Sequence, residues 1–161
     1  MLAGEFRICA EPPTSSSVTA LMRERDDYFD RLYANDDRNA RSVDLSEESL
    51  IFLTIRTGQE LVGCGALLMR PEYGELKRFY LREAFRGRGL GRGLVRAIEI
   101  EAGRRGCRKL MLETGVLQPD AIALYEGQGF VRRGPFGAYE EDTLSVFMEK
   151  TVIAADLYQT L

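Results

Sequence analysis

The 161-residue chain contains no histidine, and this absence excludes several kinds of active site at once. Ser-His-Asp and Cys-His nucleophile systems depend on an imidazole, and so do zinc sites of the HExxH type. Zinc held by thiolates alone would need cysteine pairs at short spacing, whereas Cys9, Cys64 and Cys107 lie far apart. We therefore expect no metal site, and acid–base chemistry is left to carboxylates, tyrosine, lysine or cysteine.

Long apolar runs and disulfide patterns are also missing. No segment approaches the ~20 apolar residues needed to cross a bilayer, and residues 1–9 lack the basic and apolar regions of a signal peptide. An odd number of cysteines among apolar neighbours favours reduced, buried thiols. With 45% apolar and 29% charged residues, we expect one cytoplasmic domain over residues 1–161 and no membrane partner.

The net charge of −3 hides one basic segment. The segment from Arg86 to Lys109 contains eight basic residues and only two acidic ones, Glu99 and Glu101. It therefore carries a net charge of +6 in an otherwise acidic chain. A nucleic-acid-binding module is one interpretation of such a segment. No aromatic residues alternate with the arginines to stack on bases, however. We therefore expect a particular anionic ligand and no nucleic acid.

Apolar periodicity and turn residues predict the order of the elements. A helix is expected after the Thr14 and serine caps, and the charges at 23–27 could divide it in two. The spacing of Leu90, Leu94 and Ile98 predicts an amphipathic helix. A second helix is expected from Pro119. Strands are expected at 6–10, 50–55, 61–69, 75–81, 109–113, 130–132 and 144–149, which implies a mixed sheet with helices on both faces.

A glycine- and arginine-rich turn lies between the strand that ends near Leu81 and the amphipathic helix. Glycines allow backbone N–H groups to surround an anion, and a helix N-terminus adds its positive dipole end. The GxGxxG pattern fails in every register, and the Walker pattern is absent. The pattern that fits is Arg86-x-x-Gly89-x-Gly91, flanked by Gly87, Arg88, Leu90 and Arg92.

This pattern resembles the R/Q-x-x-G-x-G/A signature of the GNAT superfamily of N-acetyltransferases. Two further segments support the resemblance. The strand Glu75–Leu81 precedes the turn at the family's separation, and residues 118–130 resemble the family's N-x-x-A-x-x-L-Y-E-x-x-G-F segment, with Gln118 in place of Asn. The resemblance is dense from about residue 61 to 150. It implies a mixed, mostly antiparallel sheet of about seven strands, splayed between strands four and five.

The resemblance also implies acetyl-CoA as cosubstrate. Phe79, Tyr80 and Leu81 would pair with its pantetheine arm, and an amide near Leu81 would polarise the thioester carbonyl. Gln118 would lie beside that arm. The turn from Arg86 to Arg92, comprising Arg86, Gly87, Arg88, Gly89, Leu90, Gly91 and Arg92, would hold the diphosphate and the 3′-phosphate.

Two residues take catalytic roles in this interpretation. Tyr125 would donate to the departing thiolate, although a tyrosine in a helix can simply pack against the sheet. Glu75 would take the acceptor's proton, usually through water, although it could instead be a strand-end carboxylate paired with Lys77 or Arg78. Cys107 is expected in the core, because no histidine activates it.

The acceptor is expected to be a small primary amine, and relatives make a homodimer plausible. Tyr28, Tyr33 and Tyr139 lie in segments that border the acceptor pocket in relatives, as packing or as recognition residues. Glu113 could line that pocket or pair with Arg108. Asp36, Asp37 and Asp44 would suit a cationic amine. A catalytically silent acyl-CoA sensor of the same fold is the alternative function.

Overall fold

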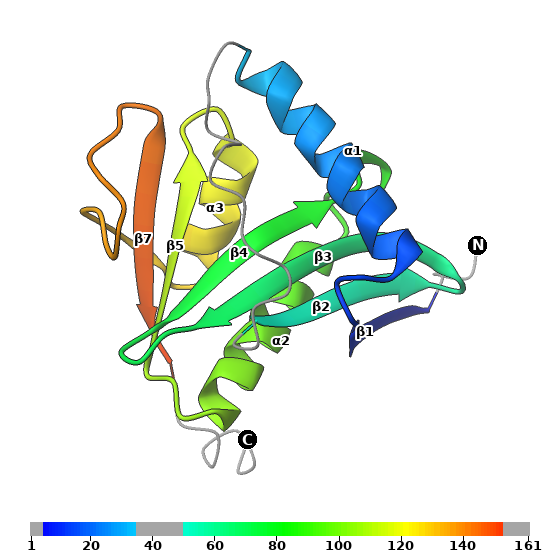
Figure 1. The fold of residues 1–161 in the computed structure, drawn as a ribbon, viewed down its shortest axis with the longest axis horizontal. Coiled ribbons are helices and arrows are strands. Elements are labelled where there is room, and N and C mark those ends of the chain that lie inside the picture. The colour runs from blue at the N-terminus through cyan, green and yellow to red at the C-terminus, as the bar shows by residue number, and fades with distance from the viewer. Residues whose placement is uncertain (1–4, 35–49, 153–161) are drawn as a thin grey trace.

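The computed structural model describes residues 5–34 and 50–152, which form a seven-stranded sheet between two layers of helix (Figure 1). The strands lie in the order β1-β2-β3-β4-β5-β7-β6, and every neighbouring pair is antiparallel except β4 and β5. This confirms the predicted mixed, mostly antiparallel sheet. The strands are β1 (Phe6–Ala10), β2 (Leu50–Thr57), β3 (Glu60–Met69), β4 (Gly74–Leu81), β5 (Lys109–Gly115), β6 (Val131–Arg133) and β7 (Ser145–Thr151).

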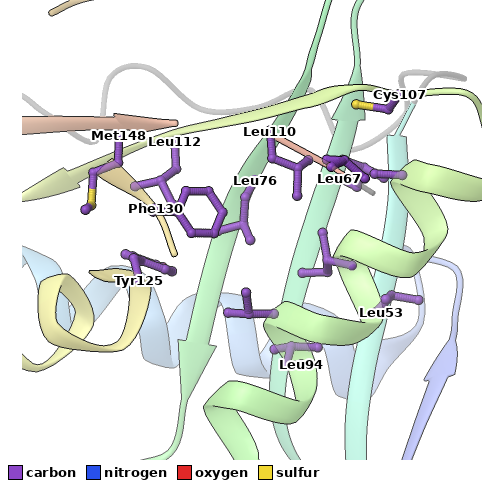
Figure 2. Close-up of a cluster of buried hydrophobic side chains, with 14 of the residues drawn as sticks. Leu53, Leu67, Leu76, Leu94, Cys107, Leu110, Leu112, Tyr125, Phe130 and Met148 are labelled. Carbon is purple, nitrogen blue, oxygen red and sulfur yellow. The ribbon is translucent and has the colours of Figure 1, made fainter. Parts of the chain in front are cut away.

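The main core lies between the sheet and two helices, α2 (Leu90–Arg104) and α3 (Pro119–Gly127) (Figure 2). Leu94, Ile98 and Ala102 are fully buried along one side of α2, which confirms the predicted apolar stripe. They pack against strand residues such as Leu67 and Leu110. Burial of this stripe, at about 25 cal/mol per Å² of apolar surface, fixes α2 beneath the central strands.

The opposite face of the sheet is covered by α1 (Ser16–Leu32), which crosses β2, β3 and β4 (Figure 1). Ser15 caps this helix, since its hydroxyl accepts a hydrogen bond from the Val18 amide at 3.4 Å. Of the two alternatives, one helix or two divided at residues 23–27, the structure shows the single helix. Val18, Leu21 and Met22 are buried, so tertiary packing outweighs the local charges.

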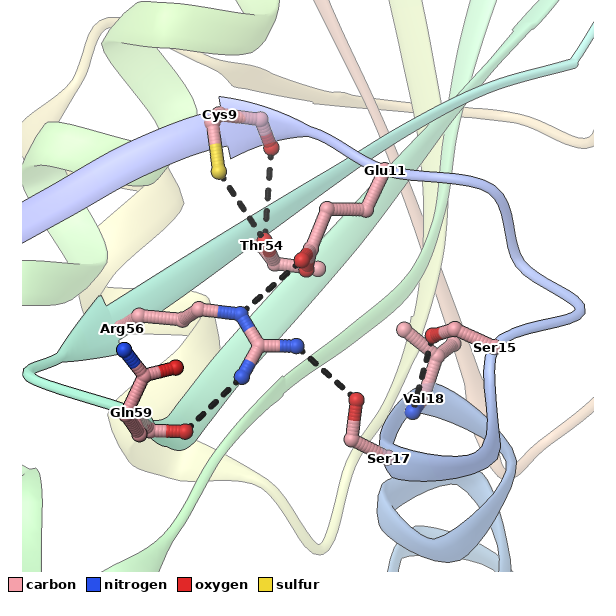
Figure 3. A network of polar contacts seen from close by, with 8 residues as sticks. All are labelled: Cys9, Glu11, Ser15, Ser17, Val18, Thr54, Arg56 and Gln59. Carbon is pink, nitrogen blue, oxygen red and sulfur yellow. Dashed lines mark hydrogen bonds and ion pairs between the residues drawn. The ribbon is translucent and has the colours of Figure 1, made fainter.

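A polar network joins the N-terminus of α1 to β1 and β2 (Figure 3). Arg56 is its centre: its Nε donates to Glu11 Oε1 at 2.9 Å and its Nη2 to the Ser17 hydroxyl at 2.8 Å. Burial opposes ionisation of Glu11, but hydrogen bonds from Thr54 and Arg56 and the charge of Arg56 lower the pKa of this carboxyl below its usual value. The network therefore joins the N-terminus of α1 to the sheet through an ionised Glu11.

We expect Glu11→Gln to destabilise the protein by about 1 kcal/mol at pH 7, because an ion pair and its charge-assisted hydrogen bond are lost. A lowered native pKa stabilises the fold above the unfolded pKa, and this contribution is lost as pH falls through the native pKa. Urea unfolding should therefore show a difference between variant and parent that shrinks as the pH falls below the unfolded value of about 4.3 and is lost below the native pKa. The exposed Glu72 provides the control Glu72→Gln. A pH-independent difference would contradict the ionised network.

Candidate active site

The sheet opens between β4 and β5. Their parallel pairing covers only Gly74–Leu76 against Leu110–Leu112, after which the strands diverge (Figure 1). The register between β3 and β4 shifts at the same point, and Arg78 takes a left-handed backbone with φ of 54°. Beyond Leu76, the β5-facing edge of β4 has no strand partner within the described residues. Its N–H and C=O groups are thus available to an extended ligand.

A cavity of about 740 Å³ lies at this opening. Residues from α1, β4, the glycine turn and the start of α3 line it. Nine of the eleven predicted cofactor residues are among them: Phe79, Tyr80, Leu81, Arg86, Gly87, Gly89, Gly91, Arg92 and Gln118. The other two lie just outside the lining: the Arg88 guanidinium lies 5.3 Å from the centre of the Phe85 ring, and Leu90 packs against the main core.

The glycine turn presents backbone amides to this cavity. Gly87 and Gly89 have φ of 76° and 82°, a left-handed conformation that favours glycine. Gly89 is the N-cap residue of α2, and without a side chain it makes no capping hydrogen bond to the amides there. Because the first amides of a helix lack intrahelical acceptors, this N-terminus is suited to bind an anion.

Arg86 fixes the turn to the end of β4. Its Nε donates to the Leu81 carbonyl at 2.8 Å. Its guanidinium also lies 5.1 Å from the ring centre of Tyr28 on α1 and 5.7 Å from that of Tyr80, within the range of cation–π attraction. The arginine of the signature thus joins α1, β4 and the turn at one edge of the cavity.

Tyr33 contacts two residues of the cavity lining, Leu117 and Gln118, in a way that the sequence does not reveal. Its hydroxyl accepts hydrogen bonds from the Leu117 amide and from Gln118 Nε2, both at 3.3 Å. Gly115 passes so close to this hydroxyl that a Cβ atom there would overlap it. The Gln118 side chain, the departure from the family's Asn, is therefore oriented by a residue 85 positions earlier in the chain.

Tyr125 is buried in the main core (Figure 2), and it is not among the residues that line the cavity. Its ring makes edge contacts with Phe79 and Phe130, each with centroids 5.8 Å apart. Burial raises the pKa of its hydroxyl; the charge of Arg25 opposes the rise and that of Glu113 adds to it. The hydroxyl stays protonated near neutral pH and makes no hydrogen bond within residues 5–34 and 50–152.

Glu75 lies on the α1 face of the sheet, one residue before β4 and β5 separate. Its side chain is buried, and Oε2 accepts a hydrogen bond from the Tyr139 hydroxyl at 2.6 Å. Lys77 Nζ lies 3.3 Å from the same oxygen and donates to the Tyr139 hydroxyl at 3.0 Å. Glu75 is not part of the cavity lining, so any proton it takes must pass through an intermediary.

The remaining candidates are placed as follows. Glu113 accepts a hydrogen bond from the Ser145 hydroxyl at 2.9 Å. Cys107 is a buried free thiol that donates to the Lys109 carbonyl, as expected of a core residue. Asp36, Asp37 and Asp44 lie outside the described residues. Within the part of the chain that is described, no helix is long and apolar enough to span a membrane.

A sheet that opens between its fourth and fifth strands, beside a glycine-rich turn, defines the class of acyl-CoA-dependent N-acetyltransferases. Sequence comparison gives the same result: the model of the acetyltransferase (GNAT) family matches residues 16–130. The chain belongs to this family, and it is a transferase of the EC 2.3.1 type that moves acetyl groups from acyl-CoA.

Several relatives share most of the chain. The IAA acetyltransferase of Azospirillum brasilense is 42% identical over 146 residues, which are 89% of this chain and 95% of that protein. A solved Klebsiella pneumoniae structure, assigned to the acyl-CoA N-acyltransferases, is 37% identical with a TM-score of 0.80, over 94% and 100% of the two chains. The PaiA N-acetyltransferase of Thermoplasma acidophilum shares the fold, with a TM-score of 0.70 at 16% identity over 91% and 99% of the chains.

Proposed function

We propose that this chain transfers the acetyl group of acetyl-CoA directly to the primary amine of a small molecule. One observation carries the proposal: a single cavity joins the unpaired edge of β4, the amides of the glycine turn and Gln118. Its volume of about 740 Å³ is in the range of small-ligand sites. The PaiA N-acetyltransferase, which shares the fold, was solved with coenzyme A, and this supports the cosubstrate.

Each part of acetyl-CoA is assigned to the groups of the cavity that suit it chemically. The edge of β4 at Phe79–Leu81 pairs with the pantetheine arm, and an amide near Leu81 polarises the thioester carbonyl. The amides of Gly87–Gly91 hold the diphosphate, together with Arg86 and Arg92. Arg88, outside the lining, is left to contact the 3′-phosphate at the mouth.

Two residues provide the proposed chemistry. The acceptor nitrogen attacks the thioester carbonyl, the C–S bond breaks, and the electron pair leaves with sulfur. Tyr125 donates a hydrogen bond or proton to the departing thiolate. Glu75 receives the proton of the acceptor ammonium, relayed by water or by the Tyr139 hydroxyl that contacts it. The nitrogen loses its second proton as the amide forms, and this proton replaces the one that Tyr125 gives to sulfur. These steps require neither a metal nor a covalent acyl-enzyme.

The experiment that tests this function measures thiol release from acetyl-CoA against amino acids, polyamines, aminoglycosides and basic peptides. Release with a small amine, and acetylation of that amine by mass spectrometry, would support the proposal. Tight acetyl-CoA binding without thiol release for any of these acceptors would instead favour the acyl-CoA sensor. Exclusive turnover of the peptides would contradict a small-molecule acceptor.

The role of the glycine turn can be tested separately with Gly89→Val. Valine is strained at a φ of 82°, so the amides of the turn should move and the Kd for acetyl-CoA should rise at least about tenfold. The matched control is Gly58→Val, because Gly58 has a φ of 59°, lies in the β2–β3 turn and has open space around it. Calorimetric titration of both variants should show weaker binding only for Gly89→Val. Equal affinity would place the cosubstrate elsewhere.

A further inference from the structure

Arg25 occupies a position on α1 where the helix faces the sheet. Its side chain is 17% exposed, and it follows the buried Leu21 and Met22 by one helical turn. Its Nη1 contacts Asp26 Oδ1 at 3.1 Å, and its guanidinium lies 4.6 Å from the ring centre of Phe29. Its Nε is fully buried and has no hydrogen-bond partner within the described ranges. A buried donor without a partner costs free energy unless a ligand accepts from it.

A second guanidinium lies beside the first. Arg78 comes from the left-handed position of β4, its side chain is 14% exposed, and its Nη1 lies 3.4 Å from the same Asp26 oxygen. Asp26 itself is 45% exposed and is therefore well solvated. Two arginines thus share one carboxylate and retain an excess positive charge. Cys64 does not offset this charge, because burial raises the pKa of its thiol to about 12.

Arg25 and Arg78 do not themselves line the cavity, but Arg25 contacts a residue that does. Phe29, under the Arg25 guanidinium, lines the cavity together with Tyr28. The charge of Arg25 also acts on the Tyr125 hydroxyl, the proposed donor to the leaving thiolate. The pair therefore lies on the α1 side of the opening, across the sheet from α2 and its glycine turn (Figure 1).

We infer that Arg25 and Arg78 bind a carboxylate of the acceptor, so that the acceptor class is the amino acids; this inference rests on the proposed function. A carboxylate fits the planar fork of a guanidinium and satisfies the buried Nε. The arginines also disfavour a second ammonium, which counts against polyamines and aminoglycosides. Their charge further lowers the pKa of the acceptor's own ammonium and so raises the fraction of nucleophilic amine.

The test compares L-amino acids with the corresponding L-amino acid amides, which keep the amine and replace the carboxylate. With the parent enzyme, kcat/KM for the acids should exceed that for the amides by about 10- to 100-fold, the effect of a charge-assisted hydrogen bond. Arg25→Gln should abolish this preference, mainly through KM. The control Arg23→Gln removes an exposed arginine two residues earlier on α1 and should preserve the preference.

Two further measurements, the Tm of Arg25→Gln and the binding of N-acetyl amino acids, complete the test. Arg25→Gln should not lower the Tm, because it removes an unsatisfied buried donor; a lower Tm with an unchanged preference would overturn the inference as a structural role. Equal kcat/KM for acids and amides in the parent would also overturn it, while the proposed function would stand. If no acceptor turns over, calorimetric binding of N-acetyl amino acids in the presence of CoA decides. Binding lost in Arg25→Gln supports the carboxylate site, and no binding to the parent overturns it.

Discussion

Replacing Tyr125 by Phe is expected to lower kcat by about 100-fold, the effect of removing one hydrogen-bond donor from a transition state. Burial keeps the hydroxyl protonated, and the hydroxyl makes no hydrogen bond to another described residue. It is therefore free to donate to the thiolate as the C–S bond breaks. The Kd for acetyl-CoA should stay within about twofold, because the ring contacts with Phe79 and Phe130 remain.

Single-turnover kinetics with the best acceptor should measure this effect on the chemical step itself. The Tm of Tyr125→Phe should match that of the parent, since the substitution leaves no buried polar group unsatisfied. Tyr73→Phe removes a hydroxyl from the other face of the sheet and serves as the control. An unchanged single-turnover rate would contradict the donor role and leave Tyr125 as a packing residue between α3 and the sheet.

Much of the fold follows from local patterns in the sequence. The spacing of Leu90, Leu94 and Ile98 predicts α2, because this pattern reflects residues that are near one another in the chain. The glycine turn is predictable for the same reason, since left-handed backbone at Gly87 and Gly89 requires a particular residue type. These are the parts of the site that a short motif can specify.

The parts that could not be predicted depend on contacts between distant segments. The Tyr33–Gln118 hydrogen bond spans 85 residues, and nothing near either residue indicates it. Arg78 adopts a left-handed backbone without being glycine, because the register shift to β3 imposes it. Arg25 is the most informative failure: a charge on the buried side of α1 suggests a helix break, whereas the helix continues and places the guanidinium beside the cavity. Local rules are expected to fail at functional positions.

The Glu75→Gln variant should show the second large effect, a loss of about 100-fold in kcat/KM near pH 7. An alkylammonium with a pKa near ~10 is almost entirely protonated there, so a base must remove its proton before attack. Gln keeps the shape of the side chain and can still accept from Tyr139, but it cannot take a proton. The deficit should therefore shrink as the pH approaches 10, because the amine then deprotonates in solution.

A matched control separates base catalysis from the structural effect of losing a buried charge. Glu99 is 4% exposed, as is Glu75, and it pairs with Lys150 at 2.8 Å, but it lies on α2 away from the cavity. Glu99→Gln and Glu75→Gln should both lower the Tm, since each leaves a lysine without its buried partner. Only Glu75→Gln should lower kcat/KM with a deficit that high pH relieves. If that deficit is the same at every pH, Glu75 positions Lys77 and Tyr139, and the proton passes to another group.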